Sequence, residues 1–291
     1  MKKTLSIITA LTLIALSATS YVPKEGEIRT TVYQTTEDRP LREILTTPFT
    51  KQYYAHKAIE TIDLDDARAD HEYMGCGVSL SDASCWLLSG MGRKARKQFY
   101  RQVFSKEGAN LSMLRLNCGS SDYATEVYNY DDVEGDVGMK HFSIKRDKKC
   151  MIPLIKKALA VNPDMTLWAC PWSPPTWMKS NHNYATKADK LNGMDPKLEV
   201  KTGAEDMVNQ DERTLDAYAR YLCKFLTEYK KARVNVGMIM FQNEPYTHNI
   251  WPNCSWSPRG IANFVGKYLG PRLRREHKDV ELWHGTMNTS N

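Results

Sequence analysis

The sequence predicts an α/β fold of the (β/α)8 TIM-barrel type, with about the first five strand units present. Short apolar runs alternate with amphipathic helical patterns, which implies parallel strands joined by crossover helices. Polar or aromatic groups follow each run, as at the mouth of a barrel. A nucleotide-binding open sheet would carry a glycine-rich turn after its first strand, whereas Gly75-Cys76-Gly77 precedes the strand-like residues and lacks a third glycine. The pattern therefore favours a barrel.

Each strand and the helices between them can be placed on the sequence. The expected strands are residues 75–80, 111–116, 165–169, 236–241 and 280–283. Helical periodicity fills the intervals, because the apolar residues of 151–159 and of 215–229 each fall on one helical face. The groups expected at the strand ends are Ser81-Asp82, residues 117–122, residues 171–173, Asn243-Glu244 and residues 286–288.

Residues 1–20 have the composition of a secretory signal peptide. Lys2 and Lys3 precede an apolar core at 5–16, and small residues follow at 17–20. The core is too short for a membrane span, and no cysteine follows that could carry a lipid anchor. We therefore expect a secreted or periplasmic protein with a signal of the bacterial type.

Two further segments are expected after the signal peptide. In residues 21–70, the stretches 30–33 and 61–64 alternate like exposed antiparallel strands, which predicts part of a β side domain. Residues 71–291 are expected to be the N-terminal part of a TIM-barrel domain, and they contain its five predicted strand units.

Composition excludes several classes of function. The chain is 42% apolar and 25% charged with a formal net charge of +6, which is ordinary for a globular protein. Its basic runs at 93–97 and 272–275 are typical of solvated helix faces, and no aromatic and basic strand pattern for nucleic acid accompanies them. The seven cysteines form no CxxC pair, so neither a metal site nor a disulfide framework is indicated. Most are expected to be buried thiols, including Cys76, Cys118 and Cys170.

Two long loops are candidates for contact with a ligand. Residues 179–210 are polar and longer than a plain connection needs, so this loop either faces substrate or is mobile. Residues 246–258 bring Tyr246, Trp251 and Trp256 into the sequence neighbourhood of a candidate acid, Glu244.

Glu244 is the first candidate for a catalytic acid/base. The apolar run 236–241 stops at Gln242-Asn243-Glu244-Pro245, and proline prevents the strand from continuing. The acid is therefore expected at the carboxyl end of a strand, beside an amide, where it could transfer a proton to a bound polyol. The alternative is that Glu244 closes the loop and pairs with a lysine or arginine.

Four segments, in order along the chain, resemble glycoside hydrolase family 30, the glucosylceramidase-like retaining β-glycosidases. They are Gly75-Cys76-Gly77-Val78-Ser79-Leu80-Ser81-Asp82-Ala83, Leu114-Arg115-Leu116-Asn117-Cys118-Gly119-Ser120-Ser121-Asp122-Tyr123, Pro171-Trp172-Ser173-Pro174-Pro175-Thr176-Trp177-Met178-Lys179 and Gln242-Asn243-Glu244-Pro245. The resemblance spans roughly residues 73–288.

The resemblance implies a role for several of these residues. Glu244 would be the acid/base, and Asn243 would bind the sugar 2-hydroxyl. Asp122 and Trp172 would line the subsite of the non-reducing sugar, with Trp177 contributing to its apolar wall. Asp82 is a further candidate for sugar contact. The alternatives are loop or core packing for the two tryptophans, a turn for Asp122 and a helix cap for Asp82.

The resemblance also implies a reaction, and it indicates which of the two catalytic carboxylates we expect to be missing. It implies a retaining double displacement on β-glucosides, such as glucosylceramide-type lipids or β-glucans, without metal or organic cofactor. Members carry the nucleophile near the end of the seventh strand, and this chain reaches its fifth, so we expect an incomplete and inactive chain. A β-xyloside is an alternative substrate. A different alternative is glycan binding without cleavage, by an aromatic mouth of Trp172, Trp177, Trp251 and Trp256.

Overall fold

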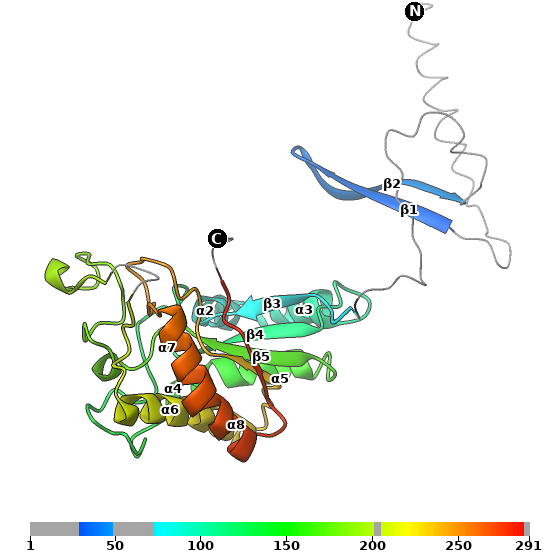
Figure 1. The fold of residues 1–291 in the computed structure, drawn as a ribbon. Coiled ribbons are helices and arrows are strands. Elements are labelled where there is room, and N and C mark those ends of the chain that lie inside the picture. The colour runs from blue at the N-terminus through cyan, green and yellow to red at the C-terminus, as the bar shows by residue number, and fades with distance from the viewer. Residues whose placement is uncertain (1–28, 49–70, 72, 201–204, 288–291) are drawn as a thin grey trace, which may run out of the picture. The chain divides into compact units, whose positions relative to one another are not determined.

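The computed structural model describes residues 29–48, 71, 73–200 and 205–287. The chain divides into two units, Met1–Glu72 and Tyr73–Asn291. In the first unit, β1 (Arg29–Thr36) pairs antiparallel with β2 (Arg39–Pro48), and the register shifts within the hairpin (Figure 1). The predicted strand at 30–33 lies in β1. The predicted signal peptide and the predicted strand at 61–64 lie outside the described residues.

Five parallel strands form the sheet of the second unit. They are β3 (Gly77–Leu80), β4 (Met113–Cys118), β5 (Thr166–Pro171), β6 (Met238–Met240) and β7 (Glu281–Trp283), and they lie side by side in chain order. Leu116 of β4 pairs with Leu80 on one side and Ala169 on the other, and Ala169 pairs with Ile239. The predicted α/β fold with five parallel strands alternating with helices is confirmed.

The strand boundaries differ from the predicted ones for local reasons. β3 begins at Gly77 because Gly75 has a φ of +119°, a conformation that breaks an extended strand. Cys76 is exposed, so the prediction that it is a buried thiol was wrong. β4 and β5 each extend two residues beyond the predicted end, to Cys118 and Pro171, which pair with each other.

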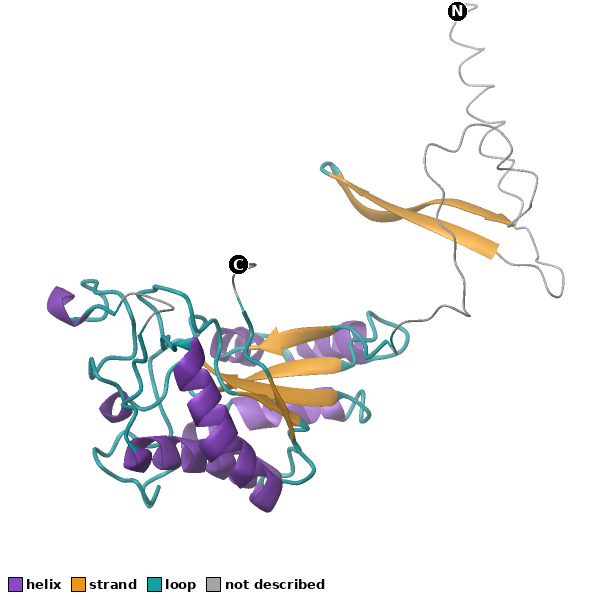
Figure 2. Cartoon of the chain, in the orientation of Figure 1, coloured by secondary structure: helices purple, strands orange, loops and turns teal. Residues whose placement is uncertain are grey.

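Helices fill the connections between the strands (Figure 2). They are α2 (Asp82–Gly90), α3 (Arg93–Phe104), α4 (Lys145–Lys149), α5 (Met151–Leu159), α6 (Glu212–Lys231), α7 (Pro258–Asn263), the π-helix η4 (Phe264–Leu269) and α8 (Gly270–Glu276), with 3-10 turns η2 (Thr176–Met178) and η3 (Pro196–Leu198). Side chains of Ser81, Asp211 and Ser257 cap α2, α6 and α7. Over the part of the chain that is described, no helix combines the length and apolarity that crossing a membrane requires.

The helices cover one face of the sheet. Leu114 and Leu116 of β4, Leu167 and Ala169 of β5 and Ile239 of β6 are all at most 3% exposed. Behind β6, Trp256 is fully buried, and its ring stacks near those of Tyr218 and Phe264. The alternative hypothesis of an aromatic mouth included Trp256, and the structure contradicts that part of it because the indole belongs to the core.

A buried carboxylate links the loop after β4 to α6. Asp147, in α4, accepts hydrogen bonds from the hydroxyls of Tyr130 (2.6 Å), Tyr229 (2.6 Å) and Tyr128 (3.2 Å). Burial raises the pKa of Asp147, although the three hydroxyls oppose that shift. The carboxylate connects segments 82 residues apart in the chain.

Candidate active site

The carboxyl ends of β5, β6 and β7 converge on Asn243 and Glu244. The backbone N–H of Asn243 donates to the carbonyl of Pro171 at the end of β5 (2.8 Å). The N–H of Glu244 donates to the carbonyl of Thr286, beyond the end of β7 (2.8 Å). The predicted acid and its neighbouring amide thus lie at the end of the sheet where the chemistry of parallel α/β enzymes is carried out.

The side chain of Asn243 is held in one orientation. Its Oδ1 accepts from the guanidinium of Arg115 (2.5 Å) and from the hydroxyl of Thr286 (2.8 Å). Because a guanidinium can only donate, the oxygen must face Arg115 and the NH2 group must face the other way. The orientation leaves an amide donor for a hydroxyl of a bound molecule.

Glu244 is fixed by backbone and side-chain contacts. It has a φ of +43°, which is uncommon for a residue other than glycine. The hydroxyl of Thr247 donates to Oε2 (3.0 Å), and the N–H of Thr247 donates to the Glu244 carbonyl (3.1 Å). Glu244 is half-buried, so solvent reaches part of its side chain. A left-handed backbone at a candidate acid is typical of functional sites that the surrounding structure holds in place.

Gln242 supports this arrangement from inside the protein. It is fully buried, and its Nε2 donates to the carbonyls of Trp172 (2.6 Å) and Asn243 (2.8 Å). Its Oε1 accepts from the indole N–H of Trp256 (3.3 Å). One buried amide therefore joins the backbone after β5 to the backbone after β6.

Trp172 belongs to the same group through Arg115. The guanidinium carbon of Arg115 lies 4.5 Å from the centre of the Trp172 ring and 5.0 Å from that of Trp168. Trp172 is largely buried, at 7% exposed. One region of the indole face is thus occupied by a cation. A sugar could approach only the part of the indole that Arg115 leaves accessible.

Trp177 lies in the 3-10 turn η2, and Asp122 lies in the loop after β4. The indole N–H of Trp177 donates to the carbonyl of Asp131 (3.1 Å), so this half-buried ring already has a partner within the protein. Asp122 is exposed in the loop that follows β4. Neither residue joins the hydrogen-bonded group around Asn243, and their contact with sugar stays a prediction.

Asp82 has protein partners for both carboxylate oxygens. Arg146 donates to Oδ1 (2.6 Å) and Oδ2 (3.0 Å), while the N–H (2.8 Å) and the hydroxyl of Thr125 donate to Oδ2. Burial alone would raise the pKa of Asp82, but the hydrogen bonds from Arg146 and Thr125 outweigh it and lower that pKa. These contacts favour a structural role in joining α2 to the loop after β4.

The long loop after η2 is held in place where it is described. Lys179 forms an antiparallel bridge with Val208, and the N–H of Ser180 donates to the carbonyl of Met207 (2.8 Å). The carbonyl of Asn249 accepts from the N–H groups of Thr186 and Lys187. The two loops after β5 and β6 are therefore bonded to each other.

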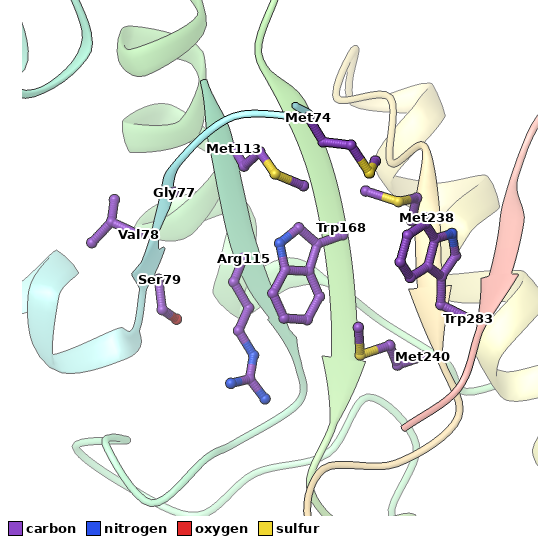
Figure 3. Close-up of a pocket in the computed structure, with 10 residues that line it drawn as sticks. All are labelled: Met74, Gly77, Val78, Ser79, Met113, Arg115, Trp168, Met238, Met240 and Trp283. Carbon is purple, nitrogen blue, oxygen red and sulfur yellow. The ribbon is translucent and has the colours of Figure 1, made fainter. Parts of the chain in front are cut away.

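A cavity of about 440 Å³ lies on the face of the sheet opposite the helix-covered one (Figure 3). Met113 and Arg115 of β4, Trp168 of β5 and Met240 of β6 line it, and Trp283 of β7 lies at its side. Figure 3 shows Arg115 extending along this face beside Trp168. Arg115 thus contributes to the apolar cavity and to the group around Asn243.

Sequence reasoning missed Arg115, Thr247 and Gln242 as contributors to the site, whereas Thr286 lies in the residues expected at the end of the fifth strand. A signal existed for Arg115, because a charged residue alternates with apolar residues in the strand Leu114-Arg115-Leu116. Its neighbours Leu114 and Leu116 face the helices, so Arg115 must face the opposite side. Thr247 carried no such signal, since it acts only through the loop conformation found in the structure.

Known proteins resemble this chain over most of the second unit. The family model for the Glycosyl hydrolase family 30 TIM-barrel domain matches residues 73–283. The lysosomal acid glucosylceramidase of Mus musculus is 29% identical over 214 residues, which cover 72% of this chain and 38% of the relative. An endo-1,6-beta-D-glucanase of Neurospora crassa is 25% identical over 233 residues, which cover 79% of this chain and 45% of the relative.

A solved structure has the same fold. SrfJ from Salmonella typhimurium matches with a TM-score of 0.72 and 26% identity, over 88% of this chain and 53% of that one. The chain therefore spans less than half of the two curated relatives and about half of the solved structure. The five parallel strands of the second unit are part of a TIM-barrel domain, and the chain belongs to glycosyl hydrolase family 30.

Proposed function

We propose that this chain carries the acid/base part of the active site of a secreted or periplasmic retaining β-glycosidase. The observation behind the proposal is the fixed pair Asn243-Glu244 at the end of β6, where Asn243 Oδ1 is bonded to Arg115 and Thr286 and its NH2 group has no hydrogen bond to another described residue. A retaining mechanism needs an acid that protonates the leaving oxygen and later activates water, and Glu244 is the candidate.

The substrate class in the proposal is a β-linked glucoside. Two relatives support it, since one is named a glucosylceramidase and the other an endo-1,6-β-D-glucanase. Both names imply a glucose unit at the reacting bond, and the second name specifies a β linkage. The Asn243 amide suits the 2-hydroxyl because a hydrogen bond there strengthens as charge develops at the neighbouring anomeric carbon.

The match covers 38% and 45% of two relatives, so the proposal assigns the second carboxylate to the part of the family domain outside this match, and we expect the chain by itself to bind glucosides. A retaining pair must lie about 5–5.5 Å apart. Asp82 is a poor candidate for the partner, because both of its oxygens are bonded to Arg146 and Thr125. The location outside the cytoplasm depends on the signal peptide predicted at residues 1–20.

The experiment tests Glu244→Gln in the protein encoded by the complete reading frame that contains this chain. Gln keeps the size of the side chain and removes the transferable proton, so hydrolysis of glucosides with poor leaving groups should fall by about 100-fold or more. Formation of the glycosyl-enzyme from activated aryl glucosides should fall much less. Unchanged turnover of gentiobiose by Glu244→Gln would show that the acid/base assignment is wrong.

A further inference from the structure

A lysine is fully buried between the two loops that carry the site. Lys179 follows η2 in the loop after β5, and its side chain is 0% exposed. Lysine is almost never fully buried unless a partner compensates its polar head. Its contacts should therefore explain why it occupies a position so close to the candidate site.

The amino group of Lys179 bonds to both loops. Its Nζ donates to the hydroxyl oxygen of Ser173 (3.1 Å) and to the carbonyl of Asn253 (2.7 Å). Ser173 directly follows Trp172 in the loop after β5, and Asn253 belongs to the loop after β6. One side chain thus connects the Trp172 segment to the segment that follows Glu244.

A short chain of contacts leads from Asn253 to the candidate acid. The side-chain amide of Asn253 donates to the carbonyl of Thr247, and the hydroxyl of Thr247 donates to Glu244 Oε2 (3.0 Å). The loop also closes on itself, because the N–H of Trp256 donates to the carbonyl of Pro245 (3.2 Å). Moving Asn253 would therefore move the group that holds the Glu244 carboxylate.

The bonds of Lys179 do not depend on an ion pair. Both partners are neutral oxygens, and among the ion pairs found between described residues none involves Lys179. Burial lowers the pKa of Lys179 to about 8, although the nearby buried Cys254 opposes that shift. A neutral amine still has two N–H donors, which match the two oxygens. The contact therefore survives loss of the proton.

We propose that Lys179 is a positioning residue that clamps the loop after β5 to the loop after β6 and so sets the place of Glu244 relative to Trp172. The proposal rests on the proposed function for the chemistry of these loops, while the clamp is a property of the chain itself. Replacing Lys179 by Met keeps a long side chain and removes both hydrogen bonds. The carbonyl of Asn253 then loses its donor in a buried setting.

The test compares hydrogen exchange in the wild-type chain, Lys179→Met and Lys224→Met at pH 7. Lys224 is the matched control, because its half-buried Nζ donates to the carbonyl of Met139, outside the two loops. We expect the amides of Thr247 and Trp256 to exchange about 10-fold faster in Lys179→Met and at the wild-type rate in Lys224→Met. In the wild-type chain, the exchange rates of the same amides, corrected for the intrinsic effect of pH, should not rise between pH 7 and 9. A neutral Lys179 keeps both hydrogen bonds over this range.

A second measurement separates the clamp from the proposed function. Gentiobiose binding to the 291-residue chain is measured by calorimetry, and Lys179→Met should weaken it about 5-fold relative to Lys224→Met. If the wild-type chain does not bind gentiobiose at millimolar concentration, the glucoside-binding part of the proposed function fails, and the exchange measurement still decides on the clamp.

Two results would overturn the clamp. The first is that the amides of Thr247 and Trp256 exchange in Lys179→Met at the same rate as in wild type. The second is that their exchange is accelerated equally in Lys179→Met and Lys224→Met. If Lys179→Met does not fold, Ser173→Ala replaces it, since it removes one partner and leaves the Asn253 contact. Faster exchange in residues 176–180 of Ser173→Ala, at N–H groups such as that of Met178, supports the clamp, and unchanged exchange there overturns it.

Discussion

The two faces of the five-stranded sheet differ in what they bury. The helix-covered face holds aliphatic side chains that solvent does not reach, such as Leu116 and Ala169 at 0% exposed. The opposite face holds half-buried Met113, Arg115, Trp168 and Met240 around a cavity. In β4 the two kinds of residue alternate along one strand, so a single segment serves both faces. The covered face supplies stability, and the other carries the polar group that the candidate site uses.

The largest expected effect comes from two truncations in β4. Leu116→Ala removes a fully buried side chain and should lower the free energy of unfolding by about 3 kcal/mol. Met113→Ala, on the other face of the same strand, should cost about 1 kcal/mol because its side chain is only half-buried. Urea denaturation of both variants measures the difference. Equal losses would show that the two faces contribute equally to the free energy of unfolding.

A smaller effect is expected at Arg115, and it should fall mainly on binding. Arg115→Met removes the hydrogen bond to Asn243 and the contacts with two indole rings, which we expect to cost about 1–2 kcal/mol of stability. Gentiobiose affinity should fall about 10-fold, because the Asn243 amide can then rotate. A stability loss as large as that of Leu116→Ala, with unchanged affinity, would assign Arg115 to packing.

The smallest effect on stability is expected at Asp131, a buried residue in the loop after β4. Burial raises the pKa of Asp131 to about 6, so the folded protein holds this proton more tightly than the unfolded chain does. The contribution of Asp131 to stability should therefore fall as pH rises from about 4 to about 7. Asp131 is only 2% exposed, but the N–H of Val133 donates to its Oδ1 (3.3 Å) and stabilises the charged form, so we expect a fall of about 1 kcal/mol.

Asp131→Asn removes this titration and provides the check. The melting temperature of the variant relative to wild type should increase between pH 4.5 and pH 7.5. A constant difference over that range would mean that Asp131 has the same proton affinity in the folded and unfolded chains.

The parallel sheet and the position of Glu244 could be predicted because they depend on local patterns. Apolar runs show strands, and Pro245 shows where the fourth of them ends. Trp256 could not be placed in the same way, because a tryptophan in a loop has no periodicity that separates a mouth from a core. Its burial follows from the docking of α6 and η4 behind β6, which brings Tyr218 and Phe264 against its ring.

The hydrogen bonds within the site depend on contacts that are distant in sequence. Arg115 and Asn243 are 128 residues apart, and their contact requires that β4, β5 and β6 lie in chain order. The sequence predicts that order, but it does not predict which side chain of β4 reaches the end of β6. Thr286 pairs with Asn243 only through the register beyond β7, which no local pattern predicts.

The carboxylate of Asp147 has a consequence for the cooperativity of folding. A buried carboxylate without donors is strongly unfavourable, so Asp147 is stabilised only when its tyrosine partners are present. Tyr130 comes from the preceding loop and Tyr229 from α6, which is made 82 residues later. A nascent chain that ends before α6 would carry the desolvation cost of Asp147 with part of the compensation missing. The loop after β4, which frames one side of the site, should therefore become ordered in the same step as α6.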